Sequence, residues 1–291
     1  MTYRMAGACA LLAGAIVLFA APAASRPVTL YALGEADTDG PANARVYAAF
    51  EAHAHPAARW YRHALQGAAV DTADFTPFRR RLETATFVSF TYYFHRDGVE
   101  YSRVYHAMSG RSDFSRELFL PRRLRQPAAL VPYPAFFTYS PGEVVAWDDD
   151  PLPDTPVTHS PVGDGRHPDA RRRDAELKIA RKVELDIANG TVAPGGALFG
   201  FSSQVPCPSC ARALEALSDS HDIDVSVTYL EPRTPAYTRF QRLREQYVNS
   251  IHVAVSGGQL NLLRQEAAAD PAAVVDCLEE ETTPPPPVQM R

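Results

Sequence analysis

The sequence predicts an α/β fold built around one mixed β-sheet. Two patterns lead to this expectation. Two runs of β-branched and aromatic residues, separated by a turn, predict a β-hairpin over residues 86–108. From residue 169 onward, segments with helical periodicity alternate with short apolar segments, which is typical of a sheet covered by helices. Together the patterns predict five strands and three helices, preceded by an N-terminal helical extension.

The first residues, 1–23, have the features of a secretory signal peptide. Arg4 supplies the positive charge, residues 6–21 form an apolar run, and Ala21-Pro22-Ala23 is a cleavage site. We therefore expect a bacterial protein that is secreted or periplasmic. After cleavage of the signal peptide, no membrane span is expected.

Residues 24–80 form the expected helical extension. Their alanine-rich composition predicts helices over Ala42–Ala54 and Pro56–Ala69. The histidines of these helices, His53 among them, are interpreted as surface positions, because no cysteine or carboxylate completes a metal-ligand set with them.

The main domain is expected over residues 81–265, and it begins with the hairpin. Its turn is Arg96-Asp97-Gly98, with glycine where a positive φ is needed. Residues 111–168 are expected to be a long loop insertion, because prolines interrupt every candidate element and many aromatic residues favour packing back on the domain. Residues 266–291 are expected to be a C-terminal segment with a proline-rich tail.

The regular alternation begins with a helix over Asp169–Ala188. Its apolar residues recur four apart on one face, and Asn189-Gly190 is a suitable end for it. The next elements are expected to be strand Ala197–Phe201, helix Pro208–Leu217, strand Ile223–Tyr229, a helix that starts at Pro235, and strand Ile251–Val255.

The composition limits the possible functions only a little. With 291 residues, 46% of them hydrophobic and 22% charged, the chain is suited to a globular protein with a sizeable core. The net charge of −5 predicts no overall basic surface for nucleic acid. After signal cleavage three cysteines remain, Cys207, Cys210 and Cys277, and an odd number argues against a disulfide framework.

Two short motifs contain the residues best suited to chemistry. Cys207 and Cys210 start a helix, where the helix dipole favours thiolates, and their spacing allows both sulfurs to bind one zinc ion. A third ligand is expected from the start of a facing helix, and Asp174 lies there. Glu176, two residues later, is suited to take a proton from water and return it to a leaving amine.

These motifs resemble those of a known superfamily. The segment from about Thr86 to Val255 is similar to the cytidine-deaminase-like superfamily, most of all to bacterial polymorphic-toxin deaminases with D-[AST]-E-x-K-[IL] and P-C-x-S-C motifs. Residues 174–179 (DAELKI) and 206–210 (PCPSC) match both motifs. The resemblance implies a three-layer α/β/α sandwich with a five-stranded mixed sheet.

The resemblance also implies a site and a function. Zinc would be bound by Asp174, Cys207 and Cys210, with Glu176 as proton shuttle. Relatives of this kind are often secreted toxins that deaminate bases in nucleic acids or nucleotides, each paired with an immunity protein.

The substrate is left open by the sequence. Loops set base selection in such enzymes, and here they are the hairpin end, with His106 and Ser109, and the 111–168 insertion. The pattern does not choose between cytosine and adenine, nor between free nucleotide, DNA and RNA.

Two other functions remain open. An exported thiol–disulfide oxidoreductase also has a strand that leads into C-x-x-C at a helix start, although no aromatic residue precedes Cys207 here and Glu176 would have no role. A non-catalytic secreted interaction protein would use zinc structurally, with a fourth ligand such as His167 or His221. Zinc content tests the first alternative, and the number of protein ligands tests the second.

Overall fold

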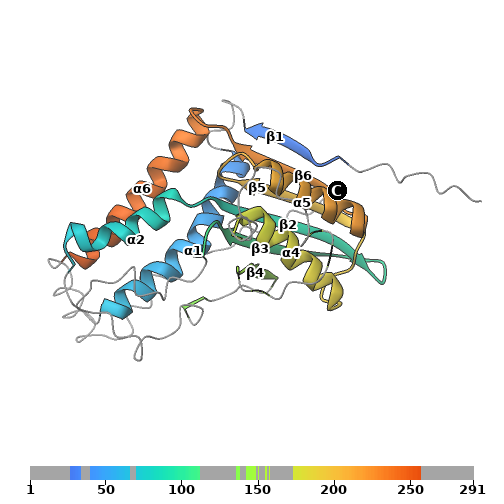
Figure 1. Ribbon diagram of the computed structural model, residues 1–291, viewed down its shortest axis with the longest axis horizontal. Coiled ribbons are helices and arrows are strands. Elements are labelled where there is room, and N and C mark those ends of the chain that lie inside the picture. The colour runs from blue at the N-terminus through green and yellow to red at the C-terminus, as the bar shows by residue number, and fades with distance from the viewer. Residues whose placement is uncertain are drawn as a thin grey trace, which may run out of the picture.

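A computed structural model shows a mixed six-stranded sheet with helices on both faces (Figure 1). The structure describes residues 27–33, 40–65, 70–111, 136–137, 142–148, 150, 155, 157 and 173–256. The strands are β1 (Thr29–Leu33), β2 (Phe87–Arg96), β3 (Val99–Met108), β4 (Glu143–Val145), β5 (Gly196–Ser202) and β6 (Asp224–Leu230). The helices in the described part are α1 (Pro41–Leu65), α2 (Thr72–Thr84), α4 (Ala175–Ala188), α5 (Pro208–His221) and α6 (Pro235–Val255).

The strand order is β1-β6-β5-β2-β3-β4, so the predicted hairpin forms the middle of the sheet. Strand β2 is antiparallel to both β3 and β5, while β6 is parallel to β5. Asp97 and Gly98 connect β2 to β3 with φ values of 52° and 76°, as a two-residue type I′ turn requires. The hairpin and its turn are therefore confirmed.

The helices form two layers, one on each face of the sheet. Along β2, Val88 and Phe90 belong to a core cluster with residues of α4 and α5, whereas Phe87 belongs to a second cluster with α1, α2 and α6. This alternation follows from the two-residue period of a strand. Figure 1 shows α4 and α5 in front of the sheet and α1 behind it. The α/β class is confirmed, with six strands in place of the five expected.

The strand expected at Ile251–Val255 is wrong, because α6 continues through it. No glycine or proline separates Tyr247 from Ile251. Val248, Ile251 and Val255 are buried and follow each other at helical spacing, so they extend the face of α6 that packs against α1 and α2. The start of α6 is as expected, with Thr234 as N-cap and Pro235 in the first turn.

The expected N-terminal extension is not separate from the sheet. Strand β1 pairs in parallel with β6 and forms one edge, and the helix pair expected here is the single helix α1 with Pro56 inside it. The missing N–H of a proline normally disfavours such a position, but the helix is buried on both sides of Pro56. His53 is fully buried against the core, so its interpretation as a surface residue is wrong.

The 111–168 insertion is described only in part, and it contains an unexpected short strand. Strand β4 pairs in parallel with β3 at the other edge of the sheet. Phe136, Phe137 and Trp147 pack against the cluster on the α1 face, which confirms the expectation that aromatic residues of this segment pack back on the domain. The expected signal peptide (residues 1–23), the remainder of the insertion and residues 257–291 lie outside the described residues.

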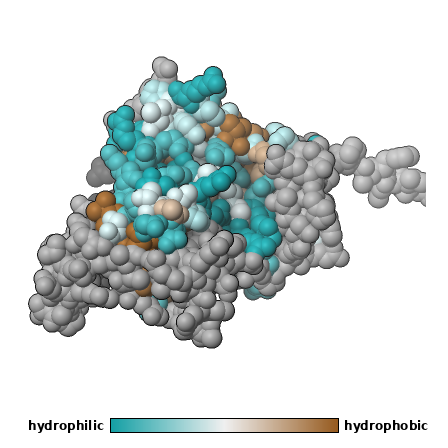
Figure 2. Space-filling view, turned by 60° about the vertical axis from the view of Figure 1, so that its left-hand side comes forward, coloured by the Kyte–Doolittle hydropathy of each residue, from teal (hydrophilic) through white to brown (hydrophobic). Residues whose placement is uncertain are grey.

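The visible described surface is mainly hydrophilic, with small separate hydrophobic areas (Figure 2). Within the described part of the chain, no helix is both long and apolar enough to cross a bilayer.

Candidate metal centre

Helices α4 and α5 begin at the same place, beside the end of β5. Asp174 is the N-cap of α4 and Cys207 is the N-cap of α5, and Pro208 occupies the first turn of α5. Sγ of Cys207 accepts a hydrogen bond from the backbone N–H of Cys210 at 3.3 Å. Because both helices direct their positive dipole ends toward this point, negative charge on the carboxylate and the thiols is stabilised there.

Asp174, Cys207 and Cys210 form a possible metal-binding triad, with one ligand atom from each within 4.8 Å of the others. Oδ2 of Asp174 lies 3.5 Å from Sγ of Cys207 and 3.7 Å from Sγ of Cys210. The Asp174 side chain makes no capping hydrogen bond to α4. An N-cap aspartate usually makes that bond, so this carboxylate faces the thiols instead.

The triad fits a tetrahedral zinc ion in donor type and nearly in spacing. With Zn–S bonds of about 2.3 Å, two sulfur ligands lie roughly 3.8 Å apart. The two sulfurs here are 3.0 Å apart, so they would separate by less than about 1 Å. Both carboxylate-to-sulfur distances already suit ligands of one ion.

The two thiols differ in acidity. A hydrogen bond with Cys210 lowers the pKa of Cys207 to about 6, and burial opposes this shift. The same hydrogen bond, together with burial, raises the pKa of Cys210. Cys207 is therefore the thiol that first becomes the thiolate that a metal requires.

Glu176 lies in the first turn of α4 and is 4% exposed. Burial raises the pKa of Glu176 to about 7, while hydrogen bonds to its backbone N–H and to Ser202 act in the opposite direction. A carboxyl group with this pKa can both accept and release a proton near neutral pH, which is the requirement for general acid–base catalysis.

Ser202, at the end of β5, fixes the orientation of Glu176. Its hydroxyl donates to Oε1 of Glu176 at 3.0 Å and accepts from the backbone N–H of Gln204 at 3.3 Å. A backbone N–H can only donate, so the Ser202 proton is directed at Oε1. The hydrogen bond to Oε1 therefore helps to hold the Glu176 carboxyl group in place.

His106 is not brought to the triad. It pairs with Ser89 on the face of the sheet that α1 covers, whereas Ser202 pairs with Val88 on the face that α4 covers. Burial lowers the pKa of His106 to about 4. Its role in substrate binding stays a prediction.

Ser109 directly follows the end of β3, near the start of α4, but its hydroxyl has a structural partner. Ser109 Oγ accepts from the backbone N–H of Thr86 at 2.8 Å, and the Ser109 N–H donates to the Thr86 carbonyl at 2.8 Å. The side chain therefore closes the open end of the hairpin.

One candidate fourth ligand is far from the triad. His221 lies at the C-terminal end of α5, a helix of 14 residues, so about 20 Å separates it from Cys207. Its Nε2 is 3.1 Å from Oε1 of Glu184 on α4, and this polar contact joins the two helices. His167 lies outside the described residues.

Sequence reasoning missed two polar residues next to the site. Ser202 follows the apolar strand predicted before the cysteine motif, and its hydroxyl at the strand end is the available signal. Lys178 is in the first motif and is 2% exposed. Residues distant in the sequence bury it, so the motif alone does not predict its burial. Comparison of the chain with protein-family models, with curated proteins and with solved structures finds no match.

Proposed function

We propose that the protein is an exported zinc-dependent deaminase of nucleobases that acts as a toxin or effector on nucleic acid or nucleotides. One observation carries the proposal. The Asp174 carboxylate and the thiols of Cys207 and Cys210 converge, and the motif that supplies Asp174 also supplies Glu176, a buried acid with a pKa of about 7. An activated water and a nearby proton carrier are the two requirements of hydrolytic deamination.

Asp174, Cys207 and Cys210 would hold the zinc ion. When bound, zinc supplies Lewis-acid activation of a water molecule at neutral pH. Three protein ligands would be compatible with a catalytic zinc site, in which a fourth ligand position stays open.

Glu176 moves the protons of the reaction. Its carboxyl group takes a proton from the attacking water and returns one to the departing amine, so that a C–O bond forms, a C–N bond breaks and ammonia leaves. The carboxyl group ends in its starting state. The hydrogen bond between Ser202 and Oε1 would orient the carboxyl group for these transfers.

The export and toxin parts of the proposal have separate support. The signal-peptide pattern of residues 1–23 supports export. The paired DAELKI and PCPSC motifs support a toxin-type deaminase with an immunity protein as partner. The base is cytosine or adenine, because deamination of either uses the same two groups.

The test in cells is expression of residues 24–291 in bacteria, followed by sequencing of DNA and RNA. The expected result is growth arrest with C-to-T or A-to-G changes, which identifies the base and the nucleic acid together. Glu176→Gln, with the same size but a side chain that does not ionise at physiological pH, is the matched variant and should abolish both effects. Equal mutation spectra for the two proteins would exclude the nucleic-acid form of the proposal, and free nucleotides would then be assayed directly.

A thiol–disulfide oxidoreductase is the second candidate, favoured by the 3.0 Å separation of the two sulfurs and the lowered pKa of Cys207. A reactive N-terminal thiol beside a buried partner is typical of redox C-x-x-C motifs. The Asp174 carboxylate argues against it, because negative charge beside a thiolate disfavours that thiolate. A zinc-free protein with a reducible Cys207–Cys210 bond would favour this candidate.

A further inference from the structure

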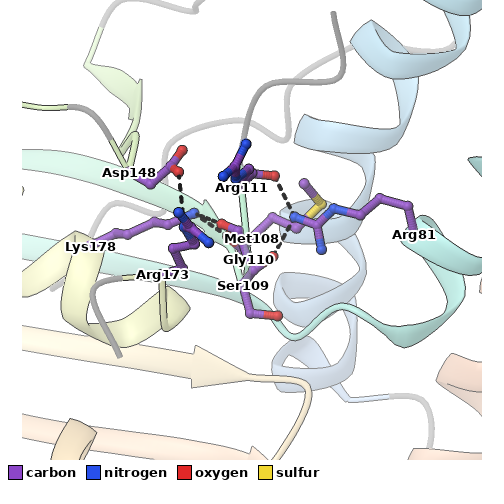
Figure 3. A network of polar contacts seen from close by, with 8 residues as sticks. All are labelled: Arg81, Met108, Ser109, Gly110, Arg111, Asp148, Arg173 and Lys178. Carbon is purple, nitrogen blue, oxygen red and sulfur yellow. Dashed lines mark hydrogen bonds and ion pairs between the residues drawn. The ribbon is translucent and has the colours of Figure 1, made fainter. Parts of the chain in front are cut away.

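Lys178 is buried at the junction between α4 and the end of β3. Its ammonium Nζ donates hydrogen bonds to the carbonyl of Met108 at 2.7 Å and to the carbonyl of Gly110 at 2.5 Å (Figure 3). Lys178 is 2% exposed and lies two residues after Glu176 on α4. The lysine therefore ties the first turns of α4 to the backbone that leaves the sheet.

The same short stretch is held from the other face of the sheet by Arg81 of α2. Its guanidinium donates to the carbonyls of Ser109 and Arg111, both at 2.5 Å. Figure 3 shows the two cations approaching the stretch from opposite sides. Four successive carbonyls, residues 108 to 111, thus alternate between the lysine and the arginine.

Gly110 makes hydrogen bonds on both sides of the segment that contains Asp174 and Glu176. Its N–H donates to the carbonyl of Arg173 at 2.6 Å, and its own carbonyl accepts from Lys178. Arg173 immediately precedes Asp174, and Lys178 follows Glu176 by two residues. One residue after β3 therefore contacts both sides of the turn that presents the metal-ligand candidate and the proton carrier.

Lysine is rare in this chain, so its occurrence at the buried position 178 is informative. Of 29 basic residues only Lys178 and Lys182 are lysine, and the other 27 are arginine. An ammonium is a compact charge with three donors, and it can lie between two carbonyls of one turn, whereas a planar guanidinium needs more room. A fully buried lysine in an arginine-rich chain is thus matched to the shape of this junction.

We propose that Lys178 is a positioning residue, which locks the first turn of α4, with Asp174 and Glu176, onto the Gly110 peptide at the exit of β3. Its effect on catalysis rests on the proposed deaminase function, whereas its anchoring of α4 does not. Loss of the ammonium frees the turn to shift, and misplacement of a catalytic group by about 1 Å costs on the order of 100-fold in rate.

Three measurements on Lys178→Met test the proposal, with Lys182→Met as matched control. Met keeps the length of the lysine stem, and Lys182 lies one turn later on α4 in an ion pair with Asp186 at 3.4 Å. The measurements are hydrogen exchange of the zinc-free protein, zinc affinity by competition with a chelator, and kcat and KM for ammonia release. All are made well below the unfolding temperature of each variant.

For Lys178→Met we expect faster exchange confined to residues 108–111 and the first turns of α4. Zinc affinity should fall about tenfold and kcat about 10- to 100-fold, with KM within about twofold. Lys182→Met should match the wild type within about twofold in each measurement. If Lys178→Met does not fold, Lys178→Gln, which keeps a donor, is measured in the same way.

Three results overturn the proposal. Wild-type exchange in both segments of the variant would show that Lys178 does not anchor the turn. Faster exchange throughout the sheet, with unchanged kcat, would show a residue of general stability only. If local exchange became faster but zinc affinity and kcat stayed unchanged, Lys178 would have no positioning role at the site. A wild-type protein without zinc and without activity would refute the proposed function, and the exchange comparison would still decide the anchoring.

Discussion

The hydroxyl of Ser202 lies 3.0 Å from Oε1 of Glu176, and the backbone N–H of Gln204 lies 3.3 Å from the same hydroxyl. This chain of two hydrogen bonds joins the end of β5 to the first turn of α4. It restricts the orientation of the Glu176 carboxyl group, because Oε1 is the atom that Ser202 contacts. Its removal has a specific consequence.

We expect Ser202→Ala to lower kcat about tenfold with little change in KM, because Glu176 remains present but loses its orientation. Ser202→Thr keeps the hydroxyl and should restore most of the rate. The neighbour Ser203 is the matched control, since its buried hydroxyl accepts from the backbone N–H of Phe87 at 2.9 Å and does not contact Glu176. Ser203→Ala should therefore reduce stability, measured by urea unfolding, and leave kcat unchanged. An unaltered kcat in Ser202→Ala would contradict the orienting role.

Removal of one triad residue should remove the metal. Asp174→Ala and Cys210→Ala each leave two ligands, so the purified variants should contain far less than one zinc per chain by elemental analysis. Ser220→Ala, exposed on the same helix as Cys210, is the control and should retain the metal. Full zinc occupancy in Asp174→Ala would show that the carboxylate is not a ligand.

Metal removal should also lower the stability of the wild-type protein. A ligand present at 100 times its Kd adds about 2.7 kcal/mol to the free energy of unfolding. For a domain of this size that corresponds to about 5–10 °C in Tm. We expect this shift between zinc-loaded and chelator-treated protein in thermal scans, and no shift in Asp174→Ala. A chelator effect of equal size in that variant would place the stabilising metal elsewhere.

The free energy of unfolding should decrease as the pH is lowered, because of His106. Its pKa is about 4 in the folded protein because of burial, against an ordinary value near 6.5. Between these values the unfolded chain binds a proton that the folded protein does not, so stability is full above about pH 7 and decreases toward pH 4. The loss from this one group is about 3 kcal/mol. Burial also lowers the pKa of His53, which adds to the loss in the same direction.

Urea unfolding between pH 4 and 7.5 measures this dependence. His106→Gln, which cannot be charged, should flatten the pH dependence relative to the wild type. His95, whose side chain is 65% exposed, provides the control His95→Gln, and its curve should follow the wild type. If the unfolding free energy of His106→Gln changed with pH as steeply as that of the wild type, other groups would cause the pH dependence.

The position of Ser202 depends on the packing of β5 against β2. Gly200 of β5 is a residue where an added side chain would disturb this packing. A Cβ added at Gly200 would lie 2.5–2.8 Å from ring atoms of Phe90, closer than carbon atoms can approach. Gly200→Ala should therefore cost about 1–3 kcal/mol of unfolding free energy, measured by urea unfolding. Ser226→Ala, on the half-buried neighbouring strand, should cost little. If Gly200→Ala were as stable as the wild type, the described pairing of β5 with β2 would be contradicted.

Local patterns in the sequence predicted the elements that position the site. Proline in the first turn marked the starts of α5 and α6, and Asp97-Gly98 marked the hairpin turn. The cysteine spacing and the aspartate at a helix start predicted three ligand candidates, and the structure brings their donor atoms together. Signals of this kind depend on neighbours within one or two turns, so they can be read along the chain.

The remaining features depend on contacts between distant parts of the chain. Strand β1 is largely exposed, and only its pairing with β6 makes it a strand. The end of α6 was misread because apolar residues at 251–255 suit a strand and a buried helix equally well. Lys178 and Ser202 gain their roles from partners 70 and 26 residues away, respectively, which no local pattern encodes.

The most direct test of the deaminase account is ammonia release by the zinc-loaded protein from single-stranded DNA, single-stranded RNA and free nucleotides of cytosine and adenine. We expect release from at least one substrate, and a loss of about 100- to 10,000-fold in Glu176→Gln with its zinc retained. Glu245→Gln, exposed on α6, should behave as the wild type. Equal ammonia release by the wild type and Glu176→Gln, or none from any substrate by a wild type with one zinc per chain, would contradict it.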